Sequence, residues 1–242
     1  IAEADLVIYQ SGFQAAVDEA IATAAPKHVI DLSANLDLLE GVAHDHDDEA
    51  EHAEETGAHE EEPGHEEEHG KDPHTWLSPA YMLTMAADAS AAIVKVAPDQ
   101  EAAQRTNLTA LSNELSQLGT DFEIGLANCE RRGFVTTHAA FAYLAKDYGL
   151  QQIPLSGLDP TVEPTAARLA EVQNIVKQNQ ITTIFFEVLT SDAVAKSLAK
   201  DLGLRTDVLD PIEGITDKSA GKDYLEVMRA NLDALRRANS CQ

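Results

Sequence analysis

Histidines and acidic residues crowd into one stretch of this sequence. Residues 44–69 hold six of the nine histidines, many Asp and Glu residues, and no Lys or Arg. Imidazoles and carboxylates bind divalent transition metals, and a tether that carries many of them offers multiple weak sites. Almost no apolar side chain offsets the entropy of ordering, so we expect disorder without metal. We interpret this collector segment as a low-affinity zinc collector rather than an incidental acidic loop; its histidines are His44, His46, His52, His59, His65 and His69.

Three further residues can build a tighter metal site. His74 follows a proline, which keeps the backbone extended, shortly before a predicted helix start. His138 and Asp210 each come directly after a predicted strand, where ligands of open α/β sheets gather. Two imidazoles and one carboxylate suit Zn2+. The three residues lie far apart in the sequence, so their spacing alone does not establish that they meet, and His74 taken alone also fits a structural role.

Four other polar residues near these segments are weaker candidates. Glu187 ends an apolar strand and can be a ligand, a partner that orients a histidine, or a helix cap; we favour an orienting or structural role. His28 starts a strand without metal-binding neighbours and is interpreted as structural. Arg131 and Arg132 precede a strand, where a local ion pair is the simplest role.

Short apolar runs alternate with helical periodicity along the chain, which predicts parallel sheets covered by helices and therefore an α/β fold. The predicted strands are residues 5–9, 28–32, 133–137, 152–155, 182–187 and 205–209. The predicted helices are residues 13–24, 79–96, 99–126, 139–148, 164–178, 191–202 and 218–238.

The predicted helix near residues 99–127 is unusually long and lacks Pro and Gly up to Gly119. At 1.5 Å per residue it would extend on the order of 40 Å, which suits a strut across two lobes. We therefore expect an N-terminal lobe at 1–98, a linking helix at 99–127 and a C-terminal lobe at 128–242.

Charge and hydropathy exclude several classes of protein. A formal net charge of −25 argues against nucleic-acid binding, which needs clustered Lys and Arg. The sequence contains no run of eighteen apolar residues, so it predicts no membrane span. The sequence starts like the tail of a helix, so we expect that a leader and a first strand–helix unit precede it.

The sequence contains two cysteines, Cys129 before a predicted strand and Cys241 next to the last residue. We expect a disulfide that fixes the last helix to the second lobe, which requires an oxidising compartment. The alternative is two unrelated thiols.

Several segments together resemble one family, the zinc-binding proteins of bacterial ABC importers, in the zinc/manganese branch of the periplasmic solute-binding proteins. The similarity covers nearly the whole chain, and an acidic His-rich loop before the first segment is typical of the zinc members. The segments are DPHTWLSP (72–79), FVTTHAAFAYLAKDYGL (134–150), EPTAARLAEV (163–172), TTIFFE (182–187) and LDPIEG (209–214).

The resemblance implies two α/β lobes joined by one long helix, with metal held at their interface by four residues. Three of the four positions match His74, His138 and an acid that is Asp210, with Glu213 close enough to compete. The family's first histidine has no counterpart in this sequence. We therefore expect weaker zinc binding than in a protein with all four ligands.

As a function, the resemblance implies capture of Zn2+ outside the cytoplasm and delivery to an ABC-type permease, without enzymatic activity. Periplasmic or membrane-anchored localisation, a monomer, and a metallochaperone as a further partner are consistent with it. Manganese-binding relatives carry a carboxylate where this chain has His138, which favours zinc. Alternatives are a zinc buffer without a permease and, less favoured, a zinc hydrolase, for which no H-E-x-x-H motif is present.

Overall fold

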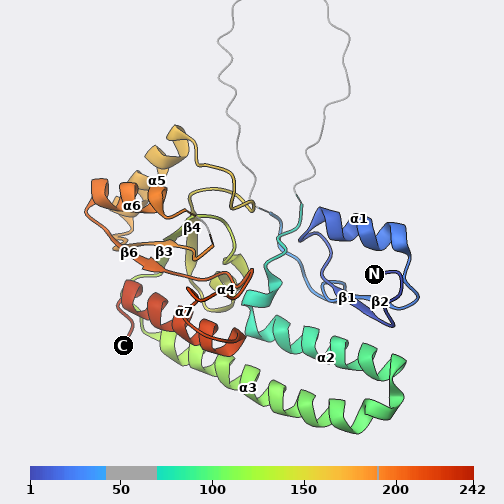
Figure 1. Ribbon diagram of the computed structural model, residues 1–242. Helices are drawn as coiled ribbons and strands as arrows, with labels where there is room; N and C mark the ends of the chain where they lie inside the picture. The colour runs from blue at the N-terminus through green and yellow to red at the C-terminus, as the bar shows by residue number, and fades with distance from the viewer. Residues whose placement is uncertain (42–69, 190) are drawn as a thin grey trace, which may run out of the picture.

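The protein is an α/β structure of two lobes with a long helix running along both (Figure 1), as the sequence predicts. The computed structural model describes residues 1–41, 70–189 and 191–242. The collector segment predicted at 44–69 lies outside the described residues, so its role stays a prediction.

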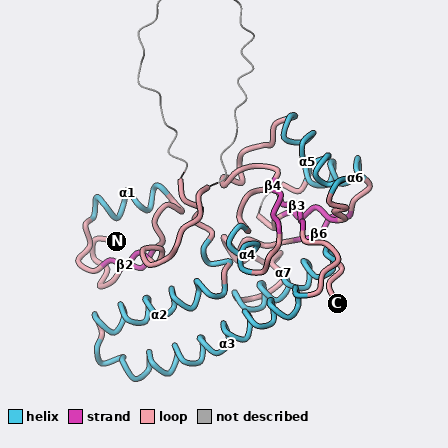
Figure 2. The backbone as a smooth tube through the Cα atoms, turned by 180° about the vertical axis from the view of Figure 1, so that it is seen from behind, coloured by secondary structure: helices cyan, strands magenta, loops and turns pink. Residues whose placement is uncertain are grey.

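The first lobe is built on a pair of parallel strands, with Val7 opposite Val29. One helix, α1, connects the two strands, and α2 lies on the other side of the pair in both views (Figures 1 and 2). Ser78 starts α2, because its hydroxyl accepts a hydrogen bond from the Tyr81 N–H. The elements are β1 (Val7–Tyr9), α1 (Ala15–Ala24), β2 (Val29–Asp31), η1 (Thr75–Leu77) and α2 (Pro79–Val96).

The long helix α3 (Glu101–Ala127) belongs to both lobes. A short turn, η2 (Pro98–Gln100), reverses the chain so that the first half of α3 packs antiparallel to α2, and its second half lies along α7 (Figure 1). Its 27 residues extend about 40 Å. The buried apolar residues of α3 lie in its second half; they are Leu115, Leu118, Phe122 and Leu126. The last three of them help to form the core of the second lobe.

The second lobe is a four-stranded parallel sheet in the order β4-β3-β5-β6. Side chains alternate between its two faces. Phe134 and Phe185 enter a core shared with α3 and α7, and Val135 and Ile184 enter a second core with α5 and α6. The sheet is thus buried on both sides, as parallel sheets are. The elements are β3 (Gly133–Thr136), α4 (Ala142–Asp147), β4 (Gln151–Pro154), α5 (Ala166–Gln178), β5 (Thr183–Phe186), α6 (Ala193–Leu202), β6 (Arg205–Val208) and α7 (Tyr224–Asn239).

Two helices, α4 and α7, begin three or more residues later than the periodicity predicts. Helix α4 starts at Ala142 rather than 139, because the N–H groups of Ala139 and Phe141 donate across to Gly157 and Gln152 instead of continuing a helix. Helix α7 starts at Tyr224 rather than 218, because the Asp223 carboxylate caps it by accepting from the Glu226 N–H.

The predicted disulfide between Cys129 and Cys241 is present and joins the end of α3 to the end of α7. Arg131 makes the expected local ion pair, with Glu130. Arg132 instead donates to the last carbonyls of α3, those of Leu126 and Ala127. Within the described part of the chain, no helix is long and apolar enough to cross a membrane.

Candidate metal centre

His74 is held by an acidic residue two positions before it. The Asp72 carboxylate accepts a 2.9 Å hydrogen bond from the His74 N–H and lies 2.8 Å from His74 Nδ1. Both residues are almost fully buried. The Tyr143 hydroxyl donates to the Asp72 carbonyl over 2.7 Å, and the Gln10 amide donates to the carbonyl of Pro73. The backbone and the ring of His74 are therefore fixed together.

His138 is held by a residue from a neighbouring strand. It follows β3, and its Nδ1 lies 2.5 Å from an oxygen of Glu187, which follows β5. The hydroxyl of Thr137 donates to the same oxygen. Strands β3 and β5 are adjacent, and the connections from β3 to β4 and from β5 to β6 leave toward opposite edges of the sheet. Ligand sites of open α/β sheets lie at such a switch point.

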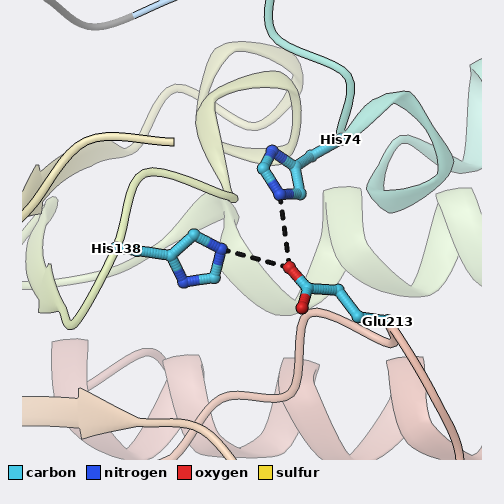
Figure 3. Close-up of side chains that lie close together, drawn as sticks. All are labelled: His74, His138 and Glu213. Atoms are coloured by element: carbon cyan, nitrogen blue, oxygen red, sulfur yellow. Dashed lines mark ion pairs between the residues drawn. The ribbon is translucent and has the colours of Figure 1, made fainter. Parts of the chain in front are cut away.

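Glu213 lies between the two histidines, in the loop that follows β6 (Figure 3). Its Oε1 is 3.5 Å from His74 Nε2 and 3.3 Å from His138 Nε2. One ligand atom of each residue lies within 4.8 Å of the others. Two ligands placed 2.0–2.1 Å from a tetrahedral Zn2+ would be roughly 3.3 Å apart, so these separations fit a metal ion.

The nitrogen atoms that face the centre are the ones a metal needs. Each histidine directs Nδ1 to a carboxylate, that of Asp72 or Glu187, which leaves Nε2 toward Glu213. A proton on Nδ1 places a lone pair on Nε2 and raises the basicity of the ring. His138 Nε2 is buried, and it lies 3.3 Å from the Glu213 oxygen with which it would share a metal ion.

Electrostatics couple these three residues in the metal-free protein. Hydrogen bonds with His138 and then His74 hold the pKa of Glu213 at about 2. Burial lowers the pKa of His138, but contacts with Glu187 and Glu213 outweigh it and raise that pKa to about 9. The pKa of His74 is raised in the same way by Asp72 and Glu213 against burial. A metal ion entering the centre must therefore displace protons.

Asp210, the acid first expected as a ligand, lies outside this group of three. Its Oδ1 accepts a 2.8 Å hydrogen bond from the Ile212 N–H, and burial raises its pKa. The structure instead brings the competing acid, Glu213, to the two histidines. Glu187 takes the orienting position that was favoured for it, and His28 lies directly before β2, outside the centre.

The turn that presents Glu213 is strained and firmly anchored. Ile212 has φ of +56°, a left-handed conformation that costs a β-branched residue about 1–3 kcal/mol. The Asn231 amide of α7 holds the start of the turn, since it accepts from the Asp210 N–H at 2.9 Å and donates to the Asp210 carbonyl at 2.7 Å. This support is invisible to sequence patterns, because Asn231 lies 21 residues beyond Asp210.

Two lobes, a helix that runs along both, and two histidines and a glutamate that could hold a metal ion are the features of a solute-binding fold. The chain belongs to the family described as zinc-uptake complex component A, periplasmic (ZnuA), which it matches over residues 1–238.

Curated relatives agree with this family. The chain is 38% identical over 246 residues to the zinc-binding lipoprotein AdcA of Streptococcus pneumoniae, covering 98% of this chain and 46% of that protein. It is 36% identical over 241 residues to the high-affinity zinc uptake system protein ZnuA of Bacillus subtilis, covering 98% of this chain and 72% of that protein. The chain therefore spans about half the length of the AdcA proteins that it matches.

Solved structures show the same fold. The Zn(II)-bound ZnuA-like domain of Streptococcus pneumoniae AdcA has a TM-score of 0.74 at 34% identity, covering 99% of this chain and 81% of that domain. The laminin-binding protein Lbp of Streptococcus pyogenes has a TM-score of 0.79 at 28% identity, covering 99% and 84%.

Proposed function

We propose that this protein captures Zn2+ outside the cytoplasm and delivers it to an ABC-type permease. The observation that carries the proposal is the convergence of His74 Nε2, His138 Nε2 and a Glu213 oxygen. Each imidazole is already oriented by a carboxylate, so little ordering is left for the metal to impose. The same centre argues against the hydrolase alternative, which needs an acidic residue as a general base. Asp72 and Glu187 instead orient the two histidines.

Zinc is the metal that this donor set favours. Imidazole nitrogens suit Zn2+, whereas Mn2+ prefers a larger share of oxygen ligands. The centre offers two imidazoles and one carboxylate, and a tetrahedral zinc ion takes four ligands. The relatives named for zinc, in Streptococcus pneumoniae and Bacillus subtilis, support the same choice.

The partner is a membrane permease, and the location is extracytoplasmic. The family description as a periplasmic zinc-uptake component and the lipoprotein relative support both. A monomer and supply by a metallochaperone are parts of the same hypothesis. A zinc buffer would bind zinc equally well but would not dock to a permease, so docking of the zinc-loaded protein distinguishes the two.

The proposal also assigns a role to each segment of the chain. Residues 1–98 and 128–242 form the two lobes, and 99–127 link them. The collector segment at 44–69 raises the local zinc concentration for the tighter centre. Deleting the collector segment should lower the number of zinc ions bound while leaving one tight site.

Calorimetric zinc titration tests the proposal. The wild-type protein should show one tight site, and His138→Ala should lose it. His28→Ala is the matched control, because His28 lies outside the centre. Equal titration of all three proteins would contradict the proposal and would assign the metal chemistry to other residues.

A further inference from the structure

Trp76 joins the segment that carries His74 to the turn that carries Glu213. Its ring centroid is 5.3 Å from that of His74. Its indole Nε1–H donates a 2.7 Å hydrogen bond to the carbonyl of Pro211, which is 135 residues away in sequence and two residues before Glu213. One side chain therefore connects two of the three segments that supply metal ligands.

The connection is reinforced from both lobes. The Tyr224 hydroxyl, at the start of α7, donates a 2.7 Å hydrogen bond to the Trp76 carbonyl. Phe13 packs edge-on against the indole, with ring centroids 4.9 Å apart. The segment after His74 passes between the lobes close to α7 (Figure 1), which is where these contacts form. Trp76 is thus held on its backbone and on its ring.

The turn at Glu213 needs such support. Its start is fixed by Asn231, and the Ile212 N–H is fixed by the Asp210 carboxylate. Both anchors belong to the second lobe. The left-handed conformation of Ile212 disfavours the turn on its own, so the bond from Trp76 to Pro211 adds an anchor from the segment of His74.

We propose that Trp76 is a positioning residue for Glu213: its indole N–H holds the Pro211 carbonyl, and this keeps the Glu213 carboxylate between the two histidines. The inference rests on the proposed zinc-binding function and assigns Trp76 a role beyond packing against His74. Loss of the N–H lets the turn relax away from the centre and weakens zinc binding through its acidic ligand.

A double-mutant cycle tests this role. Trp76→Phe keeps an aromatic ring but removes the N–H, and Glu213→Ala removes the ligand to be positioned. Zinc affinity is measured by chelator competition in the wild type, both single variants and the double variant. We expect Trp76→Phe to weaken binding about 10- to 100-fold in the wild-type background, as loss of outer partners does. In the Glu213→Ala background it should change affinity by less than about twofold.

Equal loss in both backgrounds would overturn the proposal, because it would show that Trp76 acts through His74 or through general stability. Tight binding by the wild type and by Trp76→Phe alike would also overturn it. Absence of tight binding by the wild type would instead mark failure of the proposed function itself, and with it of this inference.

Tyr81→Phe is the matched control. It removes a hydroxyl that donates to the Asp37 carbonyl within the first lobe, over 2.9 Å. Its zinc affinity should stay within about twofold of wild type. A loss as large as that of Trp76→Phe would show that any missing hydrogen bond loosens the centre, which contradicts a specific role for Trp76.

Discussion

The two histidines of the metal centre face each other across the two lobes with ring centroids 5.3 Å apart, yet they are supported in different ways. His74 takes its orientation from Asp72, two residues earlier, so the support is encoded in one short segment. His138 takes its orientation from Glu187, 49 residues away and directly after β5, the neighbouring strand in the sheet. The support of His74 is therefore local in sequence, whereas the support of His138 forms only when the sheet is assembled.

The two histidines should therefore differ in how well their orientation survives changes elsewhere in the protein. A short segment whose side chain accepts a hydrogen bond from its own backbone keeps its shape when the surrounding residues change. A ligand oriented across two strands depends on their register, here Val135 opposite Ile184 and Thr136 opposite Phe185. The half contributed by the second lobe should therefore respond more strongly to changes in its supporting residues.

The largest effect should follow from removing a ligand on either side. His74→Ala and His138→Ala should each weaken zinc binding by more than about 100-fold, which exceeds the usual effect of outer partners. Chelator competition measures both affinities. A loss below tenfold for either histidine would remove that side from the centre and would end the comparison between the two halves.

A smaller effect should separate the two orienting acids. Asp72→Asn keeps an oxygen that accepts from the His74 N–H, so the local turn survives and zinc binding weakens by about tenfold. Glu187→Gln has no local turn to preserve the orientation of His138, and the loss should approach 100-fold. Glu171→Gln, an exposed surface change, is the control. The comparison fails if Asp72→Asn is the more damaging variant.

Zinc binding should weaken as the pH falls. Metal needs neutral imidazoles, and His138 with a pKa of about 9 is protonated at neutral pH in the metal-free protein. Between pH 9 and 7 the affinity should fall roughly tenfold per unit for each proton released. Titration in buffers of different ionisation enthalpy should show at least one proton released per zinc ion. Release of none would show that His138 is already neutral.

The same pKa has a consequence for folding of the metal-free protein. A folded-state pKa raised from 6.5 to about 9 means that the charged form of His138 stabilises the fold. That contribution is complete below pH 6.5 and is lost as the pH rises through 9. Urea unfolding across this range should show stability falling for the wild type, and a smaller fall for His138→Gln.

The smallest effect on zinc should come from the disulfide. Cys129 lies before β3, whereas His138 lies after it, at the opposite end of the strand, so Cys129→Ser with Cys241→Ser should leave zinc affinity within about twofold. The same variant should lose about 2–5 kcal/mol of unfolding free energy, since the bond closes a loop of 112 residues. A large loss of zinc affinity would show that the end of α7 communicates with the centre.

Most of the fold could be predicted from the sequence, because apolar periodicity directly reflects burial. Strands β3 and β5 and helices α2 and α3 lie where apolar runs and helical patterns place them. The start of α7 was predicted too early, since Asp223 caps the helix and Gly221, a poor helix former, lies just before the cap.

The site was less accessible to sequence reasoning. His138 was indicated by its place after a strand, and His74 by its segment. The choice between Asp210 and Glu213 depends on a turn whose shape is set by Ile212 and by Asn231, a residue in the following helix. Asp72 could have been noticed as an orienting acid, because it precedes His74 by two residues.

Anomalous diffraction at the zinc absorption edge, from crystals of the zinc-loaded protein, tests the central claim most directly. The account predicts one strong peak bound by Nε2 of His74, Nε2 of His138 and a carboxylate oxygen of Glu213, with Asp72 and Glu187 still on the Nδ1 atoms. A peak coordinated by Asp210 or Glu187, or a tight zinc ion remote from both histidines, would contradict it.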